Sequence, residues 1–260
     1  MTNDRKKRAE RAEQMRKERE KADKRQRNVI TIAIVAVVVA LVAAGAWGVT
    51  TISSDNQRAT EEVTPEGATD DYGVLYTPAD AGAEDVEGEP VEVELYEDFL
   101  CPGCGAFEAA SGQFLTQAVE AGEISIMYRP FAFLTAQSTN RYSQRAANAA
   151  ACVLDDAGVS AFKQMHEILF ANQPTEGGAG PDDDELADFA EQAGAGDISE
   201  CLRRETFTPW VEAALERGRE EGVSGTPTVR IDGEDVSGAQ EGTIPGPPEL
   251  QEAIEAARAS

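Results

Sequence analysis

The chain contains a single histidine, His166, among its 260 residues. One histidine offers no second imidazole to a metal ion, and no Ser/His/Asp arrangement for nucleophilic catalysis is visible around it. We therefore expect His166 to have a structural or surface role and predict no metal site. The sequence also lacks a glycine-rich phosphate loop, an N-glycosylation signal and internal repeats. These absences argue against a histidine-based metal site, a hydrolase triad and a nucleotide-binding loop.

Positive charge is scarce beyond residue 27. Residues 1–27 carry 12 of the 23 lysines and arginines but 6 of the 48 acidic residues, which leaves 11 basic and 42 acidic residues for the rest. Because binding to a nucleic-acid backbone requires a basic surface, we exclude a nucleic-acid partner for this acidic part. The acidity is typical of a well-solvated protein surface.

Residues 29–49 are uncharged, and Thr31 is the one polar residue among them. About 20 such residues cross the hydrocarbon core of a bilayer, so we predict a single transmembrane helix over residues 29–52. The positive-inside rule then makes residues 1–28 a basic cytoplasmic tail and places the remainder outside the cytoplasmic membrane. A cleaved signal peptide is the alternative, because residues 44–46 imitate a cleavage site, but the apolar run is longer than a signal core.

The exported part divides into a linker and one folded domain. Residues 53–71 are polar and acidic, which is typical of a flexible linker, and residues 72–260 are long enough for one core. An even number of cysteines, all beyond the linker, fits an oxidising compartment. They are Cys101, Cys104, Cys152 and Cys201.

The apolar patterns predict an α/β domain that contains a long helical block. The order is strand, helix, strand, helical block, strand, short strand and helix. We predict main strands at residues 91–100 and 123–131, joined by a helix from Pro102 to Ala121. The helical block covers about residues 138–222. In it, Ser160 is predicted to cap one helix, and Asp182 with Glu185 resembles a capping box that opens another.

Cys101-Pro102-Gly103-Cys104 follows the first main strand directly and opens the helix. A helix N-terminus favours an anion, so we expect a lowered pKa at Cys101, and Pro102 suits the first helical turn. We interpret Cys101 and Cys104 as a redox-active pair. The alternative is a zinc site that uses all four cysteines, but the other two have no ligand close by in the sequence.

This motif, preceded by Glu97-Asp98-Phe99-Leu100, and the later Gly225-Thr226-Pro227-Thr228 resemble DsbA-like thiol–disulfide oxidoreductases of the thioredoxin superfamily. Asn172-Gln173-Pro174 also resembles the membrane-anchored actinobacterial type. The resemblance implies a thioredoxin-like fold with an inserted helical subdomain, an exposed nucleophile at Cys101, a buried partner at Cys104 and no bound cofactor. It also implies a cis bond between Thr226 and Pro227 opposite the disulfide, where the Thr226 backbone pairs with an extended substrate peptide.

The resemblance further implies an oxidase that introduces disulfides into reduced or misoxidised exported proteins. A membrane quinone-linked protein would regenerate its disulfide. Gly103 departs from the Cys-Pro-His-Cys of the best-known strong oxidants, so a reductase or isomerase that uses the same site stays open. A non-catalytic binding or chaperone module is the alternative from another class, and the two intact motifs argue against it.

Four further residues have two interpretations each. Cys152 and Cys201 match a second, structural disulfide of actinobacterial members, and free thiols or a relay pair are the alternative. Glu97 and Asp98 are candidates for proton transfer around Cys104, because a buried thiol needs a base when a mixed disulfide resolves. They could equally be strand-end acids that face water.

Overall fold

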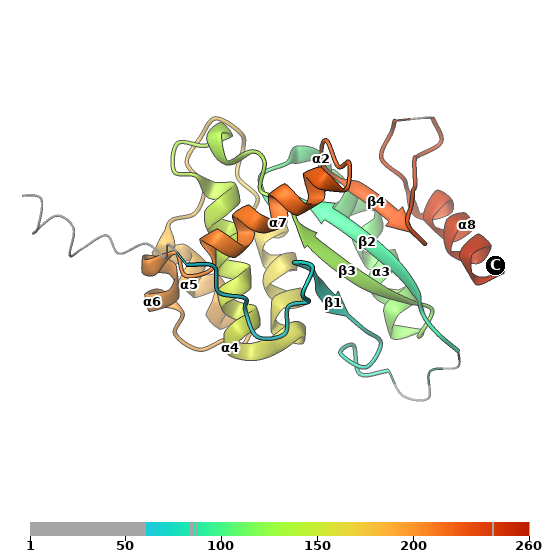
Figure 1. The fold of residues 1–260 in the computed structure, drawn as a ribbon, viewed down its shortest axis with the longest axis horizontal. Coiled ribbons are helices and arrows are strands. Elements are labelled where there is room, and N and C mark those ends of the chain that lie inside the picture. Colours follow the sequence, from blue (N-terminus) through green and yellow to red (C-terminus); the bar gives the residue numbers. More distant parts are fainter. Residues whose placement is uncertain (1–60, 84–85, 87, 241, 260) are drawn as a thin grey trace, which may run out of the picture. The chain divides into compact units, whose positions relative to one another are not determined.

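The computed structural model describes residues 61–83, 86, 88–240 and 242–259, which form a mixed β-sheet with helices on both faces (Figure 1). The five strands have the order β1-β3-β2-β4-β5. β2 and β3 are parallel, whereas β1 and β4 are antiparallel to their central neighbours. This confirms the predicted α/β fold class. The strands are β1 (Val74–Tyr76), β2 (Val91–Glu97), β3 (Ile124–Pro130), β4 (Thr228–Ile231) and β5 (Glu234–Asp235).

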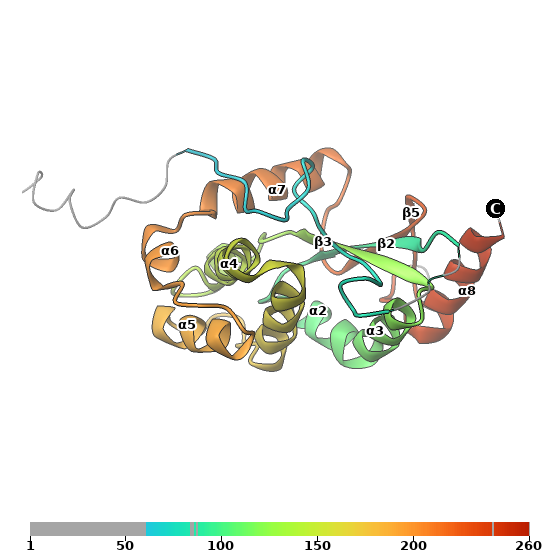
Figure 2. The same ribbon diagram turned by 90° about the horizontal axis from the view of Figure 1, so that it is seen from below.

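The parallel pairing of β2 with β3 positions the loop that carries the Cys-x-x-Cys motif. Glu97 at the end of β2 lies opposite Pro130 at the end of β3. Both strands are mostly buried, as expected where helices cover both faces of a sheet. Figure 2 shows α7 on one face and α2, α3 and α8 on the other. These helices are α2 (Pro102–Phe107), α3 (Gln113–Glu120), α7 (Thr208–Glu220) and α8 (Pro247–Arg258).

The predicted helix from Pro102 to Ala121 is present, but a π-helical turn, Glu108–Gly112, interrupts it between α2 and α3. Such turns insert an extra residue and are frequent at functional sites. The side chain of Glu108 occupies the space beside Gly112, because a Cβ atom on residue 112 would lie 2.6 Å from Oε2 of Glu108. The Glu108 carboxylate therefore lies against the helix instead of extending into solvent.

The helical insertion begins with one long helix that bends at a glycine. α4 runs over Tyr142–Ala171, and Gly158 within it has φ 81° and ψ −174°. Glycine adopts this conformation without a steric penalty. The bend lies two residues before Ser160, where the sequence predicts the start of a helix. The predicted cap at Ser160 is wrong. Its hydroxyl donates to the carbonyl of Asp80 at 3.0 Å, because the segment after β1 packs against α4 here.

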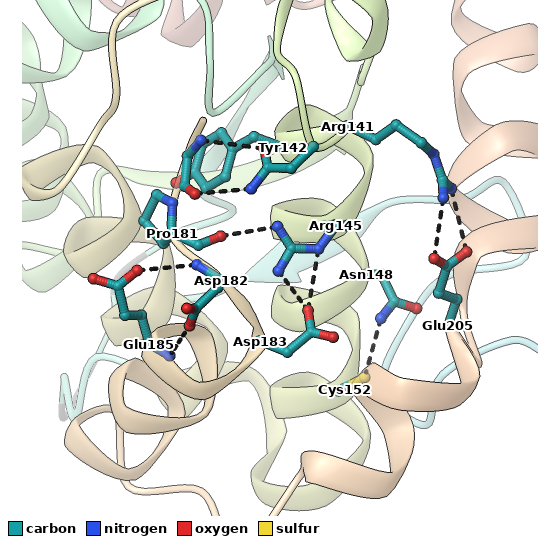
Figure 3. A network of polar contacts seen from close by, with 12 residues as sticks. Arg141, Tyr142, Arg145, Asn148, Cys152, Pro181, Asp182, Asp183, Glu185 and Glu205 are labelled. Carbon is teal, nitrogen blue, oxygen red and sulfur yellow. Dashed lines mark hydrogen bonds and ion pairs between the residues drawn. The ribbon is translucent and has the colours of Figure 1, made fainter. Parts of the chain in front are cut away.

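Polar contacts hold the next helix of the insertion to α4 (Figure 3). α5 (Asp183–Gln192) opens with the predicted capping box. The N–H of Glu185 donates to the Asp182 carboxylate and the N–H of Asp182 donates to the Glu185 carboxylate, both at 3.0 Å. Arg145 of α4 forms an ion pair with Asp183 in the first turn of α5. The first turn of α5 is thus determined by its own capping box, and the ion pair then holds it against α4.

Residues just before Tyr72 belong to the packed domain. Pro65 is buried, and the Asp71 carboxylate pairs with Arg129 of β3 at 2.8 Å. The N–H of Glu66 also donates to a carboxylate of α4 at 2.9 Å. The domain boundary predicted at residue 72 is therefore too late, because a few specific contacts hold a segment whose composition is that of a linker.

Three predicted segments lie outside the described residues. They are the basic tail (residues 1–28), the transmembrane helix (residues 29–52) and the first part of the linker (residues 53–60). Within the ranges that the structure does describe, no helix is both long enough and apolar enough to cross a membrane.

Candidate active site

Cys101 lies at the N-terminus of α2, directly after the loop that follows β2. Pro102 occupies the first turn of the helix, as predicted. The Cys101 N–H donates to the Asp98 carbonyl at 2.9 Å, and its own carbonyl accepts the N–H of Gly105 at 3.1 Å. Cys101 is 8% exposed, whereas Cys104 is fully buried, and both are free thiols. Cys101 is thus the more accessible of the two cysteines, but it is largely buried and not exposed as the resemblance implies.

The two thiols have opposite pKa shifts. The pKa of Cys101 falls from 9.0 to about 5, chiefly because Cys104 donates a hydrogen bond to its sulfur. The hydroxyl of Thr226 and the N–H groups of Cys104 and Gly103 lower it further, against the effect of burial. Burial raises the pKa of Cys104 far above its usual range. At neutral pH the reduced site thus holds a Cys101 thiolate beside a Cys104 thiol.

This pKa shift predicts a pH-dependent stability of the reduced protein relative to a Cys101→Ser variant. The folded pKa of about 5 is lower than the ordinary 9.0, so the thiolate stabilises the fold most above pH 9. The stabilisation declines as the pH falls and is lost below pH 5. Denaturant midpoints of both reduced proteins at alkaline, neutral and acidic pH measure this. A difference between them that stays constant across that range would contradict the low pKa.

Thr226 and Pro227 lie opposite Cys101, in the loop before β4. The peptide bond between them is cis, as the resemblance implies. The Sγ atom of Cys101 lies 3.4 Å from the Thr226 carbonyl oxygen, although the two residues are 125 positions apart. Gly103 lies beside the same loop, since a Cβ there would be 3.2 Å from Cδ of Pro227. The fold therefore brings the two predicted motifs together.

Asp98 is buried and shapes the loop that leads to Cys101. Its carboxylate accepts the N–H groups of Leu100 and Leu134, both at 2.8 Å. Burial raises its pKa to about 6, against the effect of these hydrogen bonds. The alternative of a water-facing acid is wrong here, because the side chain serves two backbone donors of the interior.

Glu97 is also buried, and it faces the helical insertion. Its Oε2 atom lies 2.9 Å from Nε2 of His166 on α4. Burial raises the pKa of Glu97 to about 8, and the Cys101 charge adds to that increase while Lys163 opposes it. When Glu97 is ionised, its charge in turn contributes to the raised pKa of Cys104. Glu97 is therefore protonated at neutral pH and electrostatically coupled to both thiols.

Two further residues surround Glu97: His166, for which the sequence predicted a structural or surface role and which is buried, and Glu108, which sequence reasoning missed. His166 is fully enclosed, and burial lowers its pKa to about 4, so the imidazole is neutral. Burial raises the pKa of Glu108 to about 7, and Glu108 also lines an open groove of about 390 Å³ beside α4. Glu108 follows Cys101 by seven residues, or two helical turns, and that spacing could have revealed it. His166 stands out in the sequence as the single histidine, but no local pattern indicates that it contacts Glu97.

The ligand atoms of Glu97, Glu108 and His166 lie within 4.8 Å of one another, which is close enough for the three side chains to be a candidate metal site. The positive charge of Lys163 acts on the same group, where it lowers the pKa of both carboxyls and opposes cation binding. The Lys163 charge therefore argues against a bound cation at this group.

Cys152 and Cys201 form a disulfide that joins α4 to α6 (Ser199–Arg204), with Cα atoms 6.1 Å apart. Asn148, one turn before Cys152, donates to its sulfur at 3.7 Å (Figure 3). The Asn148 carbonyl oxygen also accepts the N–H of Phe207 at 2.8 Å. The bridge therefore belongs to the packing of the insertion, and the free-thiol alternative is wrong.

A family model described as thioredoxin matches residues 86–256, and the chain belongs to that family. Its solved structural relatives include thiol–disulfide oxidoreductases of the DsbA and DsbG type.

Two of these structures come from Mycobacterium tuberculosis. The reduced disulfide bond oxidoreductase DsbG is 32% identical, with a TM-score of 0.59 over 72% of this chain and 88% of that chain. Oxidised DsbA is 31% identical, with a TM-score of 0.59 over 72% of this chain and 93% of that chain. The serine/threonine-protein kinase PknE of the same organism is 30% identical over 110 residues, which are 41% of this chain and 19% of PknE. The chain thus spans about a fifth of the length of the curated relatives it matches.

Proposed function

We propose that the chain is a thiol–disulfide oxidase that introduces disulfides into reduced or misoxidised exported proteins. The observation that carries this proposal is a low-pKa Cys101 paired with a buried, high-pKa Cys104 opposite the cis Thr226–Pro227 bond. A stabilised thiolate favours the reduced form of the pair, which makes its disulfide form more oxidising. The similarity to DsbG and DsbA of M. tuberculosis supports the same reaction class.

The proposed reaction proceeds through a mixed disulfide. A substrate thiolate attacks Sγ of Cys101, the Cys101–Cys104 bond breaks, and Cys104 leaves with the electron pair. Because its pKa is high, Cys104 takes up a proton, which protonated Glu97 donates. A second substrate thiolate then attacks the substrate sulfur and releases Cys101 as a thiolate. The substrate loses two electrons, the enzyme gains them, and solvent returns a proton to Glu97.

Extended substrate peptides would bind along the Thr226 backbone, beside the sulfur of Cys101. We further propose that residues 29–52 anchor the domain outside the cytoplasmic membrane and that residues 1–28 remain in the cytoplasm. The apolar run and the basic residues before it support this orientation. A membrane quinone-linked protein is the proposed partner that regenerates the disulfide.

The reduction potential of the Cys101–Cys104 pair tests the direction of the reaction. Equilibration of the full chain with glutathione redox buffers measures it. A value well above that of glutathione is expected for an oxidase. A value near that of thioredoxin, about −270 mV, would instead support a reductase or isomerase.

Glu97→Gln tests the proton donor. The amide keeps the shape of the side chain but cannot supply the proton, so we expect disulfide transfer at neutral pH to slow by about 10²-fold or more. Glu92→Gln, at an exposed position near the start of the same strand, is the matched control. Stopped-flow oxidation of a reduced peptide measures both variants. Equal rates in the two variants would leave Glu97 with a structural role alone.

A further inference from the structure

The side chain of Gln173 connects the helical insertion to the backbone around Cys101. Gln173 follows the end of α4, and its Nε2 atom donates to the carbonyl oxygens of Phe99 and Cys101, both at 3.0 Å. The Cys101 carbonyl is also the acceptor of the first helical hydrogen bond of α2. One amide thus bonds to the backbone on both sides of Leu100, immediately before the helix that carries the thiols.

Gly105 in the first turn of α2 makes this contact possible. A Cβ at position 105 would lie 2.3 Å from Oε1 and 3.1 Å from Cδ of Gln173. A non-bonded contact of 2.3 Å is too short for a Cβ atom, so the Gln173 amide could not keep this position if residue 105 were alanine. Gly105 and Gln173 are therefore a complementary pair from two parts of the chain.

An apolar contact reinforces the same connection. The ring of Phe99 lies 5.1 Å, centroid to centroid, from that of Phe170 in the last turn of α4. The loop before α2 is thus held by both a ring contact and an amide. The amide is the part that reaches Cys101 itself.

We infer that Gln173 is a positioning residue for Cys101, which holds the loop so that the sulfur stays at the N-terminus of α2. The inference rests on the proposed function, in which the Cys101 thiolate is the reacting group. The N–H groups of Gly103 and Cys104 stabilise that thiolate only while the sulfur remains beside them. Loss of the amide frees the loop, and the sulfur then spends time away from these donors.

Gln173→Ala in the full chain tests this role, and Asn172→Ala is the matched control. The Asn172 side chain donates to the Ile168 carbonyl at 2.9 Å within α4 and is exposed. Titration of the thiolate by its ultraviolet absorbance gives the pKa of Cys101. We expect it to rise by about one unit in Gln173→Ala, the equivalent of one hydrogen bond, and to stay unchanged in the control. The thermal midpoint of each oxidised variant reports any general loss of structure.

Two further variants keep the test decisive if Gln173→Ala folds poorly. Gln173→Glu preserves the shape of the side chain but replaces the donor by an acceptor, so it should raise the pKa of Cys101 at least as much. Gly105→Ala should raise it in the wild-type background, because it displaces the amide. In a Gln173→Ala background, Gly105→Ala should have no further effect on the pKa.

The outcomes separate this inference from the proposed function. If wild-type Cys101 fails to titrate near pH 5, the proposed function loses its main support. If the wild type titrates there but Gln173→Ala and Asn172→Ala have equal pKa values, the positioning role is refuted and the function stands. Additive effects of the Gly105 and Gln173 changes would also refute it, because a shared contact requires non-additivity.

Discussion

Replacing Cys101 by serine is expected to reduce disulfide transfer to the uncatalysed rate, whereas Cys104→Ser is expected to accumulate mixed disulfides with substrate. Serine cannot form the disulfide that a substrate thiolate attacks, so Cys101→Ser removes the reacting atom. In Cys104→Ser the sulfur of Cys101 still reacts with substrate disulfides, but the buried thiol that would resolve the mixed disulfide is absent. Oxidative refolding of a reduced protein measures transfer, and non-reducing electrophoresis detects the mixed disulfides.

A variant that lacks the other two cysteines is the control for this experiment. Cys152→Ala with Cys201→Ala removes two sulfur atoms away from the active site. We expect this variant to retain disulfide transfer at temperatures where it is folded. Full function of Cys101→Ser in cells would support the non-catalytic binding or chaperone module instead. Loss of transfer in every cysteine variant would mean that folding, and not the reacting sulfur, limits activity.

Removal of the Cys152–Cys201 disulfide is expected to lower the free energy of unfolding by about 4 kcal/mol. The bond closes a loop between residues 49 positions apart, and the chain-entropy model assigns about this value to such a loop. Most of the effect arises because the cross-link restricts the unfolded chain. Urea denaturation of Cys152→Ala/Cys201→Ala measures it, in a background where Cys101 and Cys104 are serine to prevent disulfide exchange.

The matched reference is the Cys101→Ser/Cys104→Ser protein with the bridge intact. The slope of the free energy against urea should rise when the bridge is removed, since a less constrained unfolded chain exposes more surface. A loss of less than about 1 kcal/mol would mean that the Asn148 hydrogen bonds and the packing of α4 hold the insertion without the cross-link.

Features that depend on neighbouring residues were predictable. The capping box at Asp182 and Glu185 forms because its two hydrogen bonds span three positions. The lowered pKa of Cys101 follows in the same way from its place before a helix, although the largest single cause is the thiol of Cys104 three residues later. Ser160 shows the limit of such reasoning, because a distant carbonyl competed for its hydroxyl.

By itself, the sequence determined the order of strands and helices from β2 onwards and placed the thiol pair at a helix start, because periodicity and helix-end chemistry act over a few residues. The resemblance of its two motifs to DsbA-like proteins added the expectation that a cis Thr226–Pro227 bond lies opposite Cys101. Only the tertiary structure decided that Glu97 meets His166, 69 positions away, and that Gln173 reaches the Cys101 carbonyl from 72 positions away. Such contacts depend on how α4 packs against the end of β2, and packing combines the shapes of many side chains that no local pattern specifies.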